Sequence, residues 1–190
     1  MDLSITTVLF SIFSSCLCDA EARKYTTVLT VPNGARWGIW GETEFCPKGH
    51  ANGFQLKVEP HRPNLILKDE TSLNGIRLYC TDDTQIESSV GMWGDWTKAE
   101  VCPEGNLISF SLRVQAEQGL LFDDKGGDNI RFACEHGAVL TGHSNDWGTF
   151  GPWSPPCPQG AICGIQTKVE PPQGQGDDTA LNDVRFYCCD

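Results

Sequence analysis

Three pairs of neighbouring carboxylate residues are the feature of this sequence best suited to chemistry. The pairs are Asp69-Glu70, Asp123-Asp124 and Asp177-Asp178, and each ends seven residues before an arginine. Gathered together, these carboxylates could bind a cation, an amino sugar or a basic protein. Two carboxylates about 5–5.5 Å apart could also transfer a glycosyl group, with one as the acid and the other as nucleophile or base. Neighbours in one strand point to opposite faces, so a working pair would need members from two repeats or from a turn. The competing interpretation is turn chemistry, because Asp is common ahead of Asn-Gly-type turns.

The carboxylate pairs belong to a pattern that occurs three times. Each copy has a Trp-Gly-x-Trp or Trp-Gly-x-Phe stretch, a Cys-Pro-x-Gly turn, an alternating strand and a closing Arg-x-x-Cys strand. The closing arginines Arg77, Arg131 and Arg185 are 54 residues apart, and such a fixed period indicates a repeat architecture. A repeat of about 55 residues is too short to bury a good core alone. We therefore predict one domain over residues 21–190, with repeats at approximately 27–82, 83–136 and 137–190 around a pseudo-threefold axis.

The repeats are expected to be all-β. In the first copy Phe54, Leu56 and Val58 alternate with polar residues, and the other copies alternate in the same way. This pattern is typical of antiparallel strands with one face toward solvent. No stretch shows a helical period of apolar residues, so we predict three small sheets that share a core. Six aromatic residues of the Trp-Gly-x-Trp stretches are predicted to fill the common centre, because each ring buries about 150–250 Å². They are Trp37, Trp40, Trp93, Trp96, Trp147 and Phe150.

The N-terminus predicts secretion. Residues 5–17 are mostly apolar but form a stretch shorter than the roughly 20 residues that span a bilayer. Small residues follow, so we predict a signal peptide over residues 1–20, with cleavage after Ala20 or, alternatively, after Ala22. Cys16 and Cys18 would leave with it, and the eight remaining cysteines suit a disulfide framework in an extracellular protein. No second hydrophobic segment follows, so we expect no membrane span.

The cysteine spacing predicts four disulfides. The economical pairs in the first two copies are Cys46–Cys80 and Cys102–Cys134. The third copy has four cysteines, and the neighbours Cys188 and Cys189 must point to opposite faces of a strand. We choose the nested pairing, Cys157–Cys189 with Cys163–Cys188. The alternative, Cys157–Cys188 with Cys163–Cys189, follows the repeat alignment more literally and stays open.

Charge and composition exclude several classes of partner. The chain has 25 acidic and 14 basic residues and a formal net charge of −11, so it repels nucleic acid and favours basic partners. The sequence has no Cys-x-x-Cys, and its four histidines lie without ligand spacing, so we expect no metal site. No phosphate-binding or dinucleotide motif occurs, and we expect no cofactor.

Several stretches closely resemble the vitelline membrane outer layer protein family. They are Trp93-Gly94-Asp95-Trp96, Lys57-Val58-Glu59-Pro60, the runs 73–78 and 176–183, and the final Cys188-Cys189. The resemblance extends over about Thr27 to Cys189. It implies a β-prism of type I, with three Greek-key sheets and tryptophans inside, and it supports the nested disulfides of the third repeat. It also implies a secreted protein of egg coats and other extracellular fluids, associated with basic proteins such as lysozyme and with glycoproteins.

We therefore predict a secreted structural and binding protein of an extracellular coat or fluid, which presents an acidic surface to basic proteins or glycans. Two alternatives remain. The resemblance also implies glycosyl transfer on N-acetylchito-oligosaccharides, which would make the protein an enzyme. A lectin-like carbohydrate-binding module is the other alternative, and it would expose its tryptophans rather than bury them.

Overall fold

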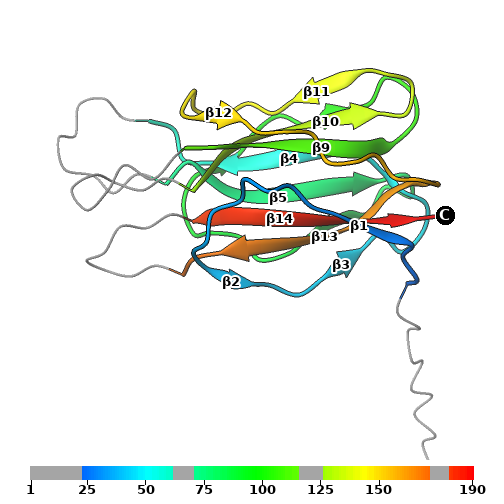
Figure 1. Cartoon of the computed structure of the whole chain (residues 1–190), viewed down its shortest axis with the longest axis horizontal. Coiled ribbons are helices and arrows are strands. Elements are labelled where there is room, and N and C mark those ends of the chain that lie inside the picture. The colour runs from blue at the N-terminus through cyan, green and yellow to red at the C-terminus, as the bar shows by residue number, and fades with distance from the viewer. Residues whose placement is uncertain (1–22, 62–70, 116–125, 172–179) are drawn as a thin grey trace, which may run out of the picture.

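A computed structural model describes residues 23–61, 71–115, 126–171 and 180–190. These residues form fourteen strands in three antiparallel sheets, with no helix among them (Figure 1). The first sheet contains β4 (Ala51–Val58), β5 (Leu73–Cys80), β6 (Gln85–Glu87), β7 (Asp95–Trp96) and β8 (Glu100–Val101). The second contains β9 (Leu107–Val114), β10 (Gly127–Cys134), β11 (Val139–Thr141) and β12 (Thr149–Phe150). The third contains β13 (Ala161–Val169), β14 (Leu181–Cys189), β1 (Thr27–Leu29), β2 (Ile39–Trp40) and β3 (Glu44–Phe45).

Each sheet combines the long strands of one sequence repeat with short strands of the next. β7 comes from the second repeat and pairs with β4 of the first, and β12 comes from the third and pairs with β9 of the second. The third sheet is completed from the start of the chain, since β1 pairs with β14 and β2 pairs with β13. In Figure 1 the blue strand β1 lies along the red strand β14. This pairing joins the two ends of the described chain and completes the third sheet.

One hydrophobic cluster joins the three sheets. The inward residues Phe54, Leu56 and Val58 of β4 are buried between partly exposed residues, as predicted, whereas in β9 Ser109 and Ser111 are also buried and Val114 is only partly buried. Four phenylalanines, Phe54, Phe110, Phe132 and Phe186, are fully buried at its centre. Their rings lie in contact, with centroids 4.7 Å apart for Phe54 and Phe132 and 4.8 Å apart for Phe110 and Phe186. Rings at such separations and tilts add to the free energy gained by burial alone.

The prediction that the six motif aromatics fill the centre is wrong. Trp37 and Trp93 are 37% and 47% exposed, and Trp40, Trp96, Trp147 and Phe150 are only partly buried. The physical reason is their position. Trp40, Trp96 and Phe150 lie in two-residue strands at sheet edges, whereas the centre is filled from the long strands, including their closing Arg-x-x-Cys segments. The alternation of those closing strands would have identified Phe132 and Phe186.

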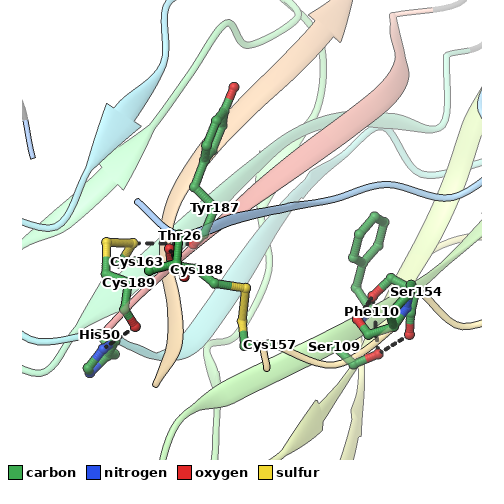
Figure 2. The surroundings of a disulfide bond; sticks show 11 residues. Thr26, His50, Ser109, Phe110, Ser154, Cys157, Cys163, Tyr187, Cys188 and Cys189 are labelled. Carbon is green, nitrogen blue, oxygen red and sulfur yellow. Dashed lines mark hydrogen bonds between the residues drawn. A yellow bond between two sulfur atoms is a disulfide. The ribbon is translucent and has the colours of Figure 1, made fainter. Parts of the chain in front are cut away.

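The first two predicted disulfides are present, and the nested pair is wrong. Cys46–Cys80 and Cys102–Cys134 form as expected, but the third repeat contains Cys157–Cys188 and Cys163–Cys189 (Figure 2). Alternation along β14 explains the outcome. Cys188 faces the core, as Cys80 and Cys134 do at the same register, and it meets Cys157 there. Cys189 faces outward and is bonded to Cys163, and this disulfide packs against Phe45 and Tyr187.

The predicted signal peptide, residues 1–20, lies outside the described residues. Within the described ranges, no helix is long and apolar enough to cross a membrane.

Paired cysteine replacements test the corrected connectivity. The C163S/C189S variant should fold, contain no free thiol and keep Cys157 linked to Cys188, with a loss of about 2–4 kcal/mol in unfolding free energy. The C163S/C188S variant is the matched control, because it leaves Cys157 and Cys189 on opposite faces of the sheet. It should show free thiols in a colorimetric assay carried out after unfolding in denaturant, because both cysteines are covered in the native protein. A nested pairing would produce the reverse thiol counts.

Candidate functional site

The second aromatic residue of each Trp-Gly-x-Trp motif is fixed by register with a long strand of the preceding repeat. Trp96 lies opposite Lys57, Trp40 opposite Lys168, and Phe150 opposite Arg113. The residue before each aromatic lies opposite the final valine of the long strand. The three motifs therefore lie at equivalent edges of the three sheets.

A glycine permits this close approach in every copy. Gly38, Gly94 and Gly148 have φ values of +88°, +79° and +72°, which L side chains rarely adopt. A Cβ on Gly94 would lie 2.2 Å from the carbonyl carbon of Val58. The motif needs glycine because the backbone of the long strand occupies the side-chain position.

A cation on each long strand fixes the segment before the motif. The Lys57 ammonium donates to the carbonyls of Gly91 and Met92 at 2.8 and 3.1 Å. The Lys168 ammonium donates to the Arg36 carbonyl at 2.6 Å. In the second sheet Arg113 takes this role and donates to the Asn145 carbonyl at 2.7 Å.

The closing arginines stack on the motif aromatics. Arg77 lies 3.9 Å from the centroid of the Trp96 ring, and Arg185 lies 3.9 Å from that of Trp40. Arg131 lies between two rings in the second sheet, 4.5 Å from Phe150 and 4.7 Å from Trp153. Such contacts are worth about 0.5–1 kcal/mol at exposed sites and hold each ring in one orientation.

Two clefts open beside the motifs. The Ile39 cleft has a volume of about 290 Å³ and is lined by Ile39, Trp40, Ser89, Val90, Gly91, Met92, Val169, Glu170 and Pro171. The Asp95 cleft has a volume of about 350 Å³ and is lined by Val58, Pro60, Asp95, Trp96, Thr97, His143, Ser144 and Asn145. Each cleft is formed by the end of a long strand, by the motif that pairs with that strand, and by the segment just before the following motif in the chain.

The two clefts are related by the internal repeat but differ in chemistry. Asp95 and Ile39 occupy the same motif position, directly before the second tryptophan, and Ile39 is 71% exposed. Ser144 likewise takes the place of Val90, three residues before the following tryptophan. The Asp95 cleft therefore has more polar side chains in its lining, with one carboxylate at its edge, while the Ile39 cleft is mostly apolar with Glu170 among its lining residues.

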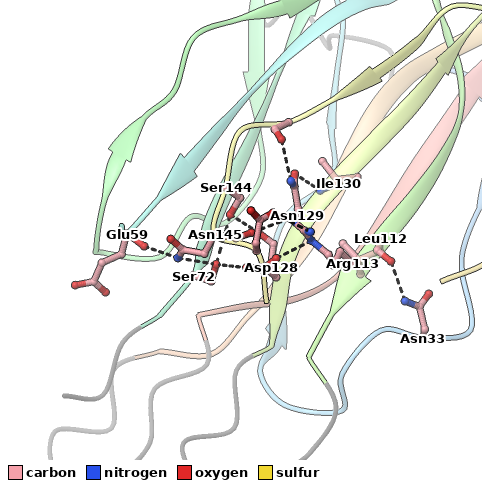
Figure 3. A network of polar contacts seen from close by, with 12 residues as sticks. Asn33, Glu59, Ser72, Leu112, Arg113, Asp128, Asn129, Ile130, Ser144 and Asn145 are labelled. Atoms are coloured by element: carbon pink, nitrogen blue, oxygen red, sulfur yellow. Dashed lines mark hydrogen bonds and ion pairs between the residues drawn. The ribbon is translucent and has the colours of Figure 1, made fainter. Parts of the chain in front are cut away.

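A buried polar network lies behind the Asp95 cleft (Figure 3). The Asp128 carboxylate accepts a hydrogen bond from Ser72 at 2.7 Å and pairs with Arg113, with 2.7 Å between Nε and Oδ2. The Asn145 amide donates to the Glu59 carbonyl and to Ser72. Burial raises the pKa of Asp128 above its ordinary value of 3.8, although the Ser72 hydrogen bond and the Arg113 charge act in the opposite direction. The residues at this position in the other two sheets are Asn74 and Asn182.

The structure does not describe the predicted acidic pairs. Asp69, Glu70, Asp123, Asp124, Asp177 and Asp178 all lie outside the described residues. Among the described residues, no group of three or more His, Cys, Asp or Glu side chains could hold a metal ion. Sequence reasoning missed the two clefts, although the Trp-Gly-x-Trp repeats marked one wall of each.

The three sheets around one core form a β-prism, and two solved proteins have a similar fold. The agglutinin of Calystegia sepium has a TM-score of 0.52 and 13% identity over 87% of this chain and 96% of its own. Frutalin from Artocarpus incisa has a TM-score of 0.52 and 14% identity over 89% of this chain and 99% of its own. These likenesses concern the fold alone.

The family model described as Vitelline membrane outer layer protein I matches residues 27–190, so the chain belongs to this family. The human vitelline membrane outer layer protein 1 homolog is 48% identical over 173 residues, which cover 87% of this chain and 84% of that protein. The mouse homolog is 44% identical over 176 residues, with 87% and 85% covered. The resemblance seen in the sequence is confirmed.

Replacing Gly94 tests the close approach of the motif. The G94A variant should lose stability both from its positive φ and from the clash with Val58. G137A is the matched control, because Gly137 has a φ of +86° but nothing within 4 Å of an added Cβ. We expect a loss of about 1–2 kcal/mol for G137A and at least about 1 kcal/mol more for G94A, measured by urea denaturation. Equal losses would contradict the packing argument.

The raised pKa of Asp128 predicts a specific pH dependence. The native carboxyl binds a proton more tightly than the unfolded one, so its contribution to stability is present below pH 3.8 and is lost as pH rises through the native pKa. The unfolding free energy of the wild type minus that of D128N should therefore fall as pH rises above 3.8. Burial also raises the pKa of Asp183, but both proteins contain it and its effect cancels. A difference between the wild type and D128N that stays constant over this pH range would contradict the assignment.

Proposed function

We propose that this protein is secreted and acts as a structural and binding protein of an extracellular coat or fluid. It presents an acidic surface to basic proteins or glycans. The observation that carries the proposal is the cross-linked prism, in which four disulfides and the β1–β14 pairing tie three sheets to one core. Disulfides persist in oxidising, extracellular surroundings, so this construction suits a protein that must last outside the cell.

Charge and family membership support the choice of partner. The excess of 25 acidic over 14 basic residues favours basic partners by long-range attraction. The human and mouse relatives are named for the outer layer of the vitelline membrane, which is an extracellular coat. The glycan part of the proposal has fold-level analogy behind it, because one β-prism of similar fold is an agglutinin.

The described clefts give the carboxylate-pair mechanism no support. A glycosyl transfer of that kind needs two facing carboxylates. In the described residues, each cleft is lined by one carboxylate, Glu170 in the Ile39 cleft and Asp95 in the Asp95 cleft. A binding role therefore has the better case at these two clefts.

Salt dependence tests the electrostatic part of the proposal. The mature protein should bind immobilised lysozyme, used as a basic probe, and the dissociation constant should rise at least about tenfold between about 0.02 and 0.5 M salt. Lysozyme with acetylated lysines is the control and should bind more weakly at low salt. Biolayer interferometry would measure both. Absent binding, or binding that salt leaves unchanged, would reject the acidic-surface proposal.

A further inference from the structure

We propose that the Asp95 cleft binds an arginine or lysine side chain of a basic partner protein. This inference rests on the proposed function, which supplies the partner, and it assigns the site and its chemistry. The cleft has a volume of about 350 Å³ and opens at the edge of the first sheet, where β7 pairs with the end of β4.

Most of the polar groups in this cleft already have partners. Asn145 donates to the Glu59 carbonyl at 2.9 Å and accepts from the His61 amide at 3.1 Å. Ser144 and Thr97 donate to the backbone carbonyls of Asp128 and Lys98. His143 contacts the Glu100 carboxylate at 3.0 Å. These groups hold the wall of the cleft and leave little hydrogen-bonding capacity for a ligand.

The Asp95 carboxylate is the exception. It is exposed, and no hydrogen bond or ion pair to it occurs within the described residues. Trp96, Val58 and Pro60 form an apolar wall beside it. A sugar would need several free donors and acceptors, whereas this cleft offers the Asp95 carboxylate and the second ring nitrogen of His143 beside an apolar wall. Arginine and lysine suit it better, because their stems pack on apolar surface while the charged group pairs with a carboxylate.

The neighbouring charges are consistent with a cation in the cleft. Lys57 is bonded to two backbone carbonyls, and Arg77 pairs with Glu87 at 2.9 Å while it stacks on Trp96. These two cations therefore have partners of their own. Glu100 adds a second carboxylate near the cleft through its contact with His143. An incoming cation would find Asp95 as the carboxylate without a partner.

The internal repeat provides a matched comparison within the same molecule. The position of Asp95 is occupied by Ile39 in the related cleft and by Thr149 in the third motif. The tryptophan, valine and proline of the wall are shared by the first two clefts. The two clefts also differ where Ser144 takes the place of Val90, but at this motif position only the Asp95 cleft has a carboxylate.

Fluorescence anisotropy with a labelled oligoarginine peptide tests this site. We expect wild-type binding, and a dissociation constant about three- to fivefold higher for D95N, as for the loss of an exposed charge pair. E42Q removes the same charge from an exposed residue in the segment between β2 and β3 and should change the constant by less than about 1.5-fold. I39D should place a carboxylate at the equivalent motif position of the Ile39 cleft and raise the stoichiometry. A peptide with citrulline in place of arginine keeps the shape without the charge and should bind neither cleft.

The outcomes separate this inference from the proposed function. The indole N–H signal of Trp96, identified with a W96F variant, should shift in the nuclear magnetic resonance spectrum on addition of the peptide. If D95N and E42Q behave alike while lysozyme still binds, the site is wrong and the proposed function stands. If neither lysozyme nor the peptide binds the wild type, both are wrong. If N-acetylchito-oligosaccharide shifts the Trp96 signal and oligoarginine does not, the cleft is a glycan site and the inference is overturned.

Discussion

The exchange of short strands between repeats is the constraint on which the rest of this structure depends. Each Trp-Gly-x-Trp strand pairs with the long strand of the preceding repeat, and the start of the chain completes the last sheet by pairing β1 with β14. No repeat can then form its sheet alone, so the three units must fold onto one core. The same register brings each motif glycine against a backbone, each arginine over a ring and each long-strand cation onto the carbonyls of a loop.

This exchange also separates two kinds of aromatic residue. The phenylalanines of the long strands are fully buried and lie in contact at the centre of the core. The tryptophans of the short strands lie at the sheet edges, where arginines cover them and clefts open beside them. Both kinds recur with the same period in the sequence. Their burial differs because long central strands face the core with one full side, whereas a two-residue edge strand presents its rings to the outer surface.

The pseudo-threefold scaffold supports different chemistry at equivalent positions. Asp128 is a buried carboxylate paired with Arg113, while asparagines occupy the same place in the other sheets. Asp95 gives one cleft a carboxylate where the related cleft has Ile39. Backbone geometry is shared because it depends on the glycines and the long strands. Single side-chain changes at the edges can therefore alter what each cleft accepts without disturbing the core.

Local periodicity and spacing along the chain were enough to predict the repeat, the all-β class, the alternation in β4 and two of the four disulfides. The remaining features depend on pairing between strands that are distant in the chain. Cys188 points to the core and Cys189 to the opposite side of the sheet because of the register of β14 against β13. The exposure of Trp37 and Trp93 and the existence of the two clefts depend on which repeat supplies each edge strand. That choice is made between residues far apart in the chain, and no local pattern records it.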